Sequence, residues 1–344
     1  IRPSTARKER AKFLAEFEAT GVNPIERDKI TIGEIVDAYL AWGRSEGKYV
    51  DQHYSQYSAH LKAKIHALPV VELTPNLLSN LKAQLLKTPT GNTKRKKATG
   101  NSKSETGKRK TLAGQTVNNI FSFMRSAINR AIATGVWSGV NPLSTKGGTW
   151  KMVKANNERL RFLTREEAKA LLDDLEKRHL QLHDMALLSL RTGLRPTEIF
   201  KLRGQDVDAN ACGLYIIQKG GKRVFVRVPE DMIQMLQAYR RKPAEPIFQQ
   251  PRKKVAFEKT PACFQTAVRK LGLAPKDGDS LYAVTLHTMR HTFASWLAQS
   301  GKVTLMELQK LMRHKNITMT MRYAHLFPGQ ESEKLSIIGD ILAA

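Results

Sequence analysis

The chain has 344 residues, enough for two domains with separate cores, and its 41% hydrophobic and 26% charged residues are typical of a globular protein. Lys and Arg number 57 against 31 Asp and Glu, a formal net charge of +26, which predicts a polyanionic partner such as nucleic acid. No apolar run reaches the roughly 20 residues that a membrane span needs. Two distant cysteines, Cys212 and Cys263, exclude a disulfide framework and favour a reducing cytosol.

The first part of the chain reads as helices. Residues 1–29 predict a basic N-terminal helix that ends at Gly21. Thr31 and Glu34 have the spacing of a capping box ahead of an apolar helical repeat. Residues 30–137 are therefore predicted to form a helical bundle. Its other helices are expected at Asp51–Ala67, from Thr74-Pro75 to Lys87, and at Gln115–Thr134.

A basic segment, residues 87–112, interrupts this bundle. Between Lys87 and Lys110 it has nine Lys or Arg residues and one acidic residue, Glu105, with almost nothing to bury. Such a composition predicts a mobile loop that contacts phosphate, and a solvated charge run is the alternative. The residues expected to contact DNA are Lys94, Arg95, Lys96, Lys97, Lys108, Arg109 and Lys110.

A Gly-rich polar stretch at residues 138–160 predicts a linker, and residues 161–344 a second domain. This domain opens with another capping-box pattern at Thr164 and Glu167. "GLYIIQKGGKRVFVRVP" predicts a β-hairpin, and residues 326–344 a tail that ends in a short amphipathic stretch. The fold class is thus mainly α with a small antiparallel sheet. Helices are expected at 165–178, 182–192, from Pro196, and at 229–240, 261–271, 286–299, 304–313 and 317–325.

The polar clusters favour one kind of chemistry. No group of carboxylates suggests a metal nuclease, and the zinc deaminase and Gly-rich phosphate-loop patterns are absent. The remaining clusters are cationic: "RTGLRPTEI", "LHTMRH", "LMRHK" and "MRYAH". Metal-free phosphoryl transfer needs such groups, because two guanidiniums can clamp the phosphate oxygens while a hydroxyl attacks.

Each residue alone is a weak signal. Arg195 read by itself is a surface arginine, and Tyr323 read by itself is a core aromatic. His287 and Arg290 are three residues apart in a predicted helix, so they share one face and can reach one phosphate. The order of the clusters in a chain this basic favours a common site.

These clusters resemble the boxes of the tyrosine recombinase (phage integrase) family, in particular an integrase of a mobile genetic island or phage. The likeness covers roughly residues 163–327 and extends more loosely over the helical bundle. In "TGLRPTEI" it implies that Arg195 is the first catalytic arginine and Glu198 its supporting acid. In "HTMRHTFAS" it implies catalytic His287 and Arg290, with His291 as an adjacent, non-catalytic histidine.

The last box, "LMRHKNITMTMRYAH", implies that His314 is the third cation and Tyr323 the nucleophile. Arg313 is a departure, because the family often has Gly at this position. The family's catalytic lysine lies in a hairpin turn, and "QKGGKRV" offers Lys219, which we prefer, and Lys222 as the alternative.

The resemblance implies a helical core-binding domain and a mixed α/β catalytic domain that clamp duplex DNA. Tyr323 is expected to form a 3′-phosphotyrosine intermediate without metal, ATP or other cofactor, in a homo-tetramer that exchanges strands between two specific sites. Accessory DNA-bending or directionality proteins are further partners that it allows, and no membrane is involved. The expected location is the bacterial cytosol, beside the nucleoid.

Two alternatives share these motifs: a type IB topoisomerase-like enzyme that relaxes DNA, and a catalytically silent DNA-binding relative. The N-terminal stretch also resembles the junction after an arm-binding domain, so the natural protein is expected to be longer.

Overall fold

The structure is a computed structural model that describes residues 29–89, 111–145, 150–154, 161–218, 221–275 and 282–329, with isolated positions between 8 and 18. The chain divides into two compact units, Ile1–Asn157 and Glu158–Ala344. Several predicted features lie outside the described residues. These are most of the N-terminal helix, the seven basic-loop residues, Lys219 and the chain after residue 329.

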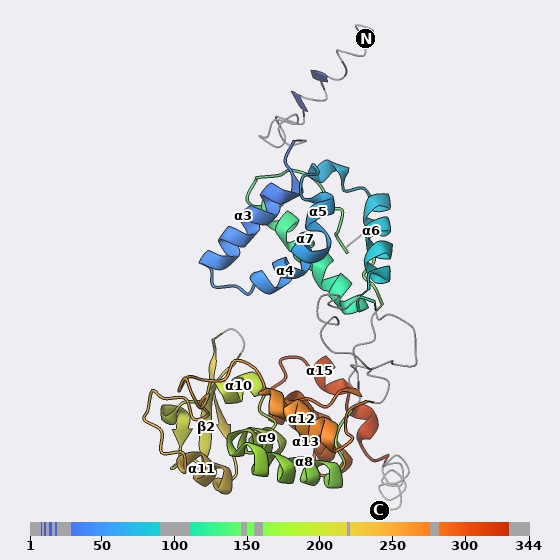
Figure 1. The fold of residues 1–344 in the computed structure, drawn as a ribbon. Coiled ribbons are helices and arrows are strands. Elements are labelled where there is room, and N and C mark those ends of the chain that lie inside the picture. The colour runs from blue at the N-terminus through green and yellow to red at the C-terminus, as the bar shows by residue number, and fades with distance from the viewer. Residues whose placement is uncertain are drawn as a thin grey trace, which may run out of the picture. The chain divides into compact units, whose positions relative to one another are not determined.

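The first unit is a helical bundle around one long helix, α7, which packs against α3, α4 and α6 (Figure 1). Its core combines aliphatic side chains with the aromatic rings of Tyr57, Phe121 and Phe123. The elements are α3 (Ile32–Ser45), α4 (Asp51–His60), α5 (Lys62–Ile65), the short 3-10 helix η1 (Val70–Glu72), α6 (Pro75–Lys87) and α7 (Gly114–Ala133).

The capping signals in the sequence mark where these helices begin. The Thr31 hydroxyl accepts from the Glu34 amide at 3.2 Å, and the Glu34 carboxylate accepts from the Thr31 amide at 2.7 Å, which confirms the capping box. The Thr31 amide, and after it the Thr31 hydroxyl, donate to the Glu34 carboxylate and lower the pKa of Glu34. Thr74 caps α6 through its hydroxyl alone, which accepts from the Leu77 amide at 3.3 Å, with Pro75 at the first helical position.

The single helix predicted at Asp51–Ala67 is divided at Leu61 into α4 and α5. Leu61 leaves helical geometry at φ −122°, although its amide still bonds to the Tyr57 carbonyl at 2.8 Å. Tyr57, Leu61 and Ile65 are four residues apart and all fully buried, so the core holds the same face on both sides of the break. The apolar repeat therefore predicted the buried face correctly and missed the break.

Residues 137–145 and 150–153, all but the first of which the sequence assigns to the linker, contribute to the core of the first unit. Trp150 lies with its ring centroid 4.6 Å from that of Phe121. The buried Asn118 side chain donates to the Val153 carbonyl at 2.9 Å and accepts from the Val153 amide at 2.8 Å. Burial of Leu143 and Trp150 outweighs the polar, Gly-rich composition that suggested a linker.

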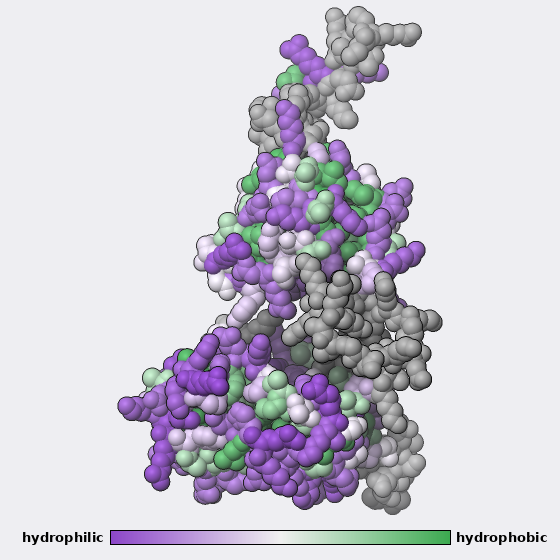
Figure 2. Space-filling model, viewed as in Figure 1, coloured by the Kyte–Doolittle hydropathy of each residue, from purple (hydrophilic) through white to green (hydrophobic). Residues whose placement is uncertain are grey.

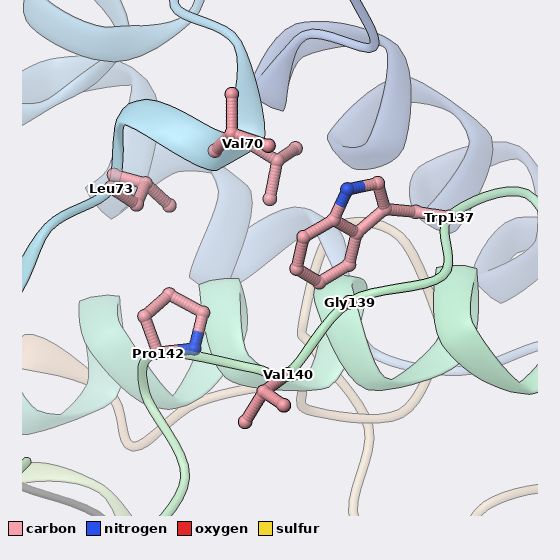
Figure 3. A pocket seen from close by; sticks show the side chains of 7 residues that line it. Val70, Leu73, Trp137, Gly139, Val140 and Pro142 are labelled. Carbon is pink, nitrogen blue, oxygen red and sulfur yellow. The ribbon is translucent and has the colours of Figure 1, made fainter. Parts of the chain in front are cut away.

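The chain after α7 folds back towards η1 and leaves a pocket of about 290 Å³ (Figure 3). Gly139 permits this path, because a Cβ there would lie 2.3 Å from the Trp137 ring. The lining is apolar and has no titratable side chain. It comprises Val70, Val71, Leu73, Trp137, Gly139, Val140 and Pro142.

In the second unit, helix α9 packs against both α8 and α13, and a small sheet lies to one side of these helices (Figure 1). The sheet is antiparallel with strand order β1-β2-β3, and Tyr215 pairs with Phe225. The helices are α8 (Arg165–Arg178), α9 (Leu180–Thr192), α10 (Pro196–Phe200), α11 (Glu230–Gln237), α12 (Ala262–Lys270), α13 (Leu286–Gln299), α14 (Leu305–Met312) and α15 (Thr318–Met321). The remaining elements are η2 (Gly204–Asp206), β1 (Val207–Asp208), β2 (Gly213–Ile217), β3 (Arg223–Arg227) and η4 (Ala324–Leu326).

The predicted hairpin is present as β2 and β3. Gly221 has φ +83° in its turn, and the Gln218 amide bonds to the Lys222 carbonyl at 2.9 Å. Strand β1 was not predicted, because two residues are too short to show an alternating pattern.

The last predicted helix, 317–325, is also divided. Helix α15 ends at Met321, η4 begins at Ala324, and Tyr323 lies at the junction. The tyrosine is therefore placed by an irregular turn.

Hydrophilic residues cover most of the visible face of each unit, with small hydrophobic patches between them (Figure 2). Within the described part of the chain, no helix is both long and apolar enough to cross a bilayer.

Replacing Asn118 with alanine tests the packing of residues 150–154. Asn118→Ala leaves the Val153 amide and carbonyl without their partner, which we expect to destabilise the first unit by about 1–3 kcal/mol. Urea unfolding followed by tryptophan fluorescence measures this, since Trp42, Trp137 and Trp150 all belong to this unit. Asn119→Ala is the control, because the partly exposed Asn119 side chain accepts only from the exposed Gln115 in the hydrogen bond that it forms, and its loss should change stability by less than about 0.5 kcal/mol. Equal losses of stability in the two variants would contradict a stabilising role for the Asn118–Val153 hydrogen bonds.

Candidate active site

The turn between α9 and α10 fixes Arg195. Helix α9 ends at Gly193, whose φ of +64° is in the left-handed region that favours glycine. Arg195 follows as the N-cap of α10, with Pro196 at the first helical position. The arginine thus stands at the start of a helix and keeps 29% of its side chain exposed.

Glu198 holds Arg195 in this position. Its carboxylate accepts from the Arg195 side chain at 2.8 Å and from the Arg195 amide at 2.8 Å. Only 4% of the Glu198 side chain is exposed, so this buried charge is paired and hydrogen-bonded. The supporting role expected for Glu198 is consistent with this geometry.

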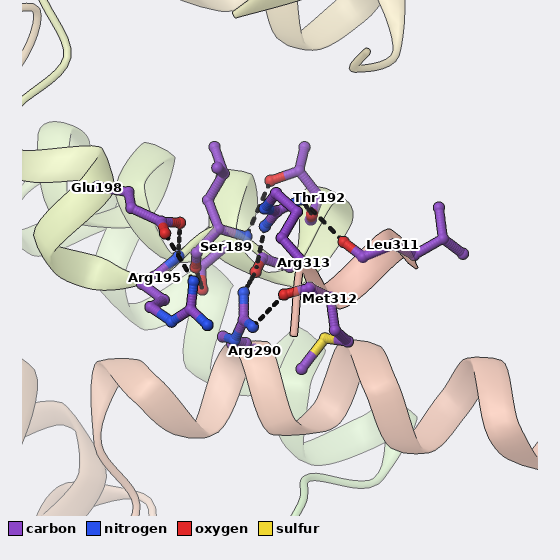
Figure 4. Close-up of polar contacts among 10 residues, drawn as sticks. Ser189, Thr192, Arg195, Glu198, Arg290, Leu311, Met312 and Arg313 are labelled. Atoms are coloured by element: carbon purple, nitrogen blue, oxygen red, sulfur yellow. Dashed lines mark hydrogen bonds and ion pairs between the residues drawn. The ribbon is translucent and has the colours of Figure 1, made fainter. Parts of the chain in front are cut away.

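Arg290, on α13, is 2% exposed, and its guanidinium lies between two backbone carbonyls (Figure 4). It donates to the Gly193 oxygen and to the Met312 oxygen, which joins the end of α9 to the end of α14. Burial lowers its pKa to about 9, and the charges of Arg195 and Arg313 act in the same direction. The guanidinium nevertheless remains charged at neutral pH.

Arg313 adds a third guanidinium that the family motif did not predict. Its backbone is left-handed at φ +53°, which is where the family's glycine would be favoured. Its side chain turns inward and donates to the Gly193 oxygen at 2.8 Å and the Leu311 oxygen at 2.8 Å. Burial lowers its pKa to about 10. Arg195 pairs with the Glu198 carboxylate, whose charge also acts on Arg290 and Arg313. Three guanidiniums near one carboxylate leave an excess of positive charge for an anion.

His314 follows directly after Arg313. Its Nδ1 lies 2.9 Å from the Thr320 hydroxyl. Burial, followed by the charges of Arg290 and Arg195, lowers the pKa of His314 to about 4, so the imidazole is neutral at pH 7.

Tyr323 is 4% exposed and lies against α13 rather than in solvent. Its hydroxyl oxygen is 2.6 Å from Nδ1 of His291. Burial raises the pKa of Tyr323 to about 12, although the charges of Arg322 and Arg290 oppose the shift. The sequence gave His291 no catalytic part, and the signal that could have suggested one is its place four residues after His287 on the same helical face.

His287, Arg290 and His291 all lie on α13, as predicted. The rings of His287 and His291 are 5.0 Å apart and nearly perpendicular, at 78°. One helix thus contributes a guanidinium on its buried side and two imidazoles in contact with each other.

The lysine assignment stays open. Lys219 lies outside the described residues, and Lys222 is exposed beside the hairpin turn. The basic-loop residues proposed to contact DNA are also outside the described range. Within the described residues, no group of three or more His, Cys, Asp or Glu side chains could hold a metal ion.

Comparison with known proteins identifies the family of the second unit. The sequence profile described as "Phage integrase family" matches residues 161–330, which include every candidate catalytic residue named above. Through these residues the chain belongs to the phage integrase family. The family is also called the tyrosine recombinases.

Relatives are similar over part of their length. The chain is 26% identical over 220 residues to the integrase of Escherichia phage 186, covering 64% of this chain and 59% of the relative. It is 30% identical over 183 residues to the tyrosine recombinase XerA of Thermococcus kodakarensis, covering 50% and 62%. The chain therefore spans about three fifths of the length of these relatives.

Solved structures share the fold over both units. A lambda integrase dimer bound to a COC′ core site has a TM-score of 0.62 at 17% identity, covering 87% of this chain and 78% of that one. The Tn1549 transposon integrase in complex with a circular intermediate DNA has a TM-score of 0.61 at 18% identity, covering 91% and 99%. The mainly helical fold with a small sheet is thus that of these integrases.

Gly193→Ala tests how the turn supports the arginines. An added Cβ would strain the left-handed backbone by roughly 1–2 kcal/mol. It would also lie 2.6 Å from a carbon of the Phe293 ring, a clash that adds about 1–3 kcal/mol. Gly272→Ala is a matched control, because Gly272 has φ +66° and nothing within 4 Å of the added atom. Calorimetry of both variants should show the larger loss for Gly193. A difference of zero would mean that the turn tolerates a side chain.

The pKa of His314 predicts a pH-dependent stability. The folded-state value of about 4 lies below the ordinary 6.5, so between these values the unfolded chain binds a proton that the folded chain does not. Stability from this group is therefore complete above pH 6.5 and falls as the pH drops towards 4. The melting temperature of the natural chain minus that of His314→Asn, measured between pH 6.5 and pH 4, should decrease as the pH drops. A constant difference would contradict the buried, neutral imidazole.

Proposed function

We propose that this chain is a site-specific DNA recombinase that cuts and rejoins duplex DNA through a 3′-phosphotyrosine bond on Tyr323. The convergence of Arg195, Arg290 and His314 with this tyrosine, within the residues that match the phage integrase family, supports the proposal most directly. The lambda and Tn1549 integrases that share its fold are bound to DNA in their structures.

The arginines bind the scissile phosphate. Arg290 uses one N–H of each terminal nitrogen on backbone carbonyls, and Arg195 directs one terminal nitrogen at Glu198. Each guanidinium has five N–H donors, so both retain donors for phosphate oxygens. Backbone carbonyls already hold Arg290, and the Glu198 carboxylate holds Arg195. Little conformational entropy is therefore lost when the phosphate binds, and the charge that develops during attack is stabilised without rearrangement.

Tyr323 is the nucleophile. At a pKa of about 12 the hydroxyl is protonated at neutral pH, so attack requires that its proton be removed. The phenolic oxygen forms a bond to phosphorus as the bond to the 5′ oxygen breaks. A lysine of the hairpin, Lys219 or Lys222, gives the departing oxygen its proton. The covalent bond conserves the energy of the broken diester, so the reaction uses neither ATP nor metal.

Strand exchange requires more than one chain. A relative, lambda integrase, has been solved as a tetramer bound to a Holliday junction. We infer that four copies of this chain act on two specific DNA sites in the bacterial cytosol, with accessory DNA-bending or directionality proteins as further partners. The helical unit and its basic loop, including Lys94–Lys97 and Lys108–Lys110, bind the DNA backbone beside the site.

Tyr323→Phe tests the chemistry. Synthetic duplexes tiled across the DNA that flanks the gene, each nicked close to the tested phosphate, trap a covalent adduct because the cleaved fragment diffuses away. The natural chain should form an adduct visible by denaturing electrophoresis, and Tyr323→Phe should form none while its Kd for the same duplex changes less than about twofold, since only one hydroxyl is removed.

The matched control is Tyr282→Phe, which removes a hydroxyl from an exposed tyrosine of the same unit and should leave the yield of adduct unchanged. Adduct formation by Tyr323→Phe would show that another residue is the nucleophile. Relaxation of any supercoiled plasmid without a requirement for paired sites would instead favour the topoisomerase alternative.

A further inference from the structure

His291 makes the shortest polar contact to the nucleophile. Its Nδ1 is 2.6 Å from the Tyr323 oxygen, and the two residues are 32 positions apart in the chain. Both side chains are buried, at 9% and 4% exposure. The family motif assigns catalytic work to His287 and Arg290, on the same helix, and none to His291.

We propose that His291 is the general base that takes the proton from Tyr323 during DNA cleavage and returns it during rejoining. This inference rests on the proposed function and names the group that activates its nucleophile.

The geometry selects His291 over the other histidines of the site. A general base must lie within about 2.6–3.2 Å of the oxygen whose proton it removes, and the His291 contact meets this condition. His314 directs its Nδ1 at Thr320, at 2.9 Å. His287 packs with its ring against the ring of His291, 5.0 Å away. With Tyr323 buried, bulk water has little access to its hydroxyl.

The charges around His291 and Tyr323 favour proton transfer between them when DNA is bound. Tyr323 is faced by Arg290 and Arg322, and both positive charges favour the phenolate. His291 is faced by His287 and by Tyr323 itself. In the free protein, a proton on His291 would add a further positive charge beside Arg290. Binding of a phosphate at Arg195 and Arg290 brings negative charge to the same place, which favours the imidazolium.

The proton balance closes in both directions. In cleavage, the O–H bond of Tyr323 breaks and its proton moves to Nδ1 of a neutral His291, whose own proton is on Nε2. The tyrosine oxygen bonds to phosphorus, and the 5′ oxygen leaves with a proton from the hairpin lysine. In rejoining, a 5′-hydroxyl attacks, its proton passes to the lysine, and the departing tyrosine oxygen recovers the proton from His291.

Two variants test the proposal on the nicked duplex that traps the natural chain. His291→Asn places an amide near the position of Nδ1 and keeps a hydrogen bond, but it cannot accept a proton. His291→Ala removes both functions. We expect both to slow adduct formation about 100-fold or more at unchanged Kd for the duplex, because general-base catalysis contributes at least about this factor. Added imidazole should accelerate His291→Ala and not His291→Asn.

A second substrate separates activation of the nucleophile from protonation of the leaving group. A duplex with sulfur in place of the bridging 5′ oxygen has a leaving group that needs no proton. This duplex should restore the rate of a Lys222→Ala or Lys219→Ala variant, whichever lysine is the acid, and should leave the His291 variants slow. Recovery of the His291 variants on the sulfur duplex would overturn the proposal.

Controls separate folding from chemistry. Melting temperatures of the variants identify a loss caused by unfolding, and His325→Asn changes an exposed histidine close to the tyrosine that should leave the rate unaltered. If His291→Asn forms adduct at the natural rate, His291 is not the base although the chain is still a recombinase. If the natural chain itself forms no adduct on any duplex, the proposed function fails, and the role of His291 with it.

Discussion

The backbone oxygen of Gly193 is the point to which the candidate active site is tied. It accepts hydrogen bonds from two guanidiniums, Arg290 from α13 and Arg313 from the end of α14. Three segments far apart in the sequence are joined at one atom, and the same turn presents Arg195. The carbonyl is available because the helix ends there, and the helix ends there because glycine accepts a left-handed backbone.

This constraint brings like charges together. Burial first, and then the charges of Arg195 and Arg313, lower the pKa of Arg290, and the Glu198 carboxylate opposes this shift. Such a cluster carries an electrostatic cost in the free protein, which a bound phosphate relieves. The three guanidiniums are hydrogen-bonded in place without DNA. In the proposed function, the same guanidiniums bind the phosphate and stabilise its developing charge.

Much of this arrangement follows from local signals in the sequence. Capping boxes at Thr31 and Thr164 mark helix starts, and the Gly-Gly turn marks the hairpin, because each depends on residues a few positions apart. The breaks at Leu61 and before Tyr323 were missed, since a periodic apolar pattern continues through them while the core changes the backbone path. Sequence order could not show that Trp150 packs on Phe121, so residues 138–160 were assigned to a linker.

The sequence by itself determined the charge balance, the helix starts and the set of residues that could act on a phosphate, because these depend on composition and short spacing. The tertiary structure decided which side chains meet. It buried Arg290 on the Gly193 carbonyl, turned Arg313 inward from a position where the family often has glycine, and placed His291 on the Tyr323 hydroxyl. These contacts span 32 to 120 residues, and they form only because α9 and α14 both pack against α13.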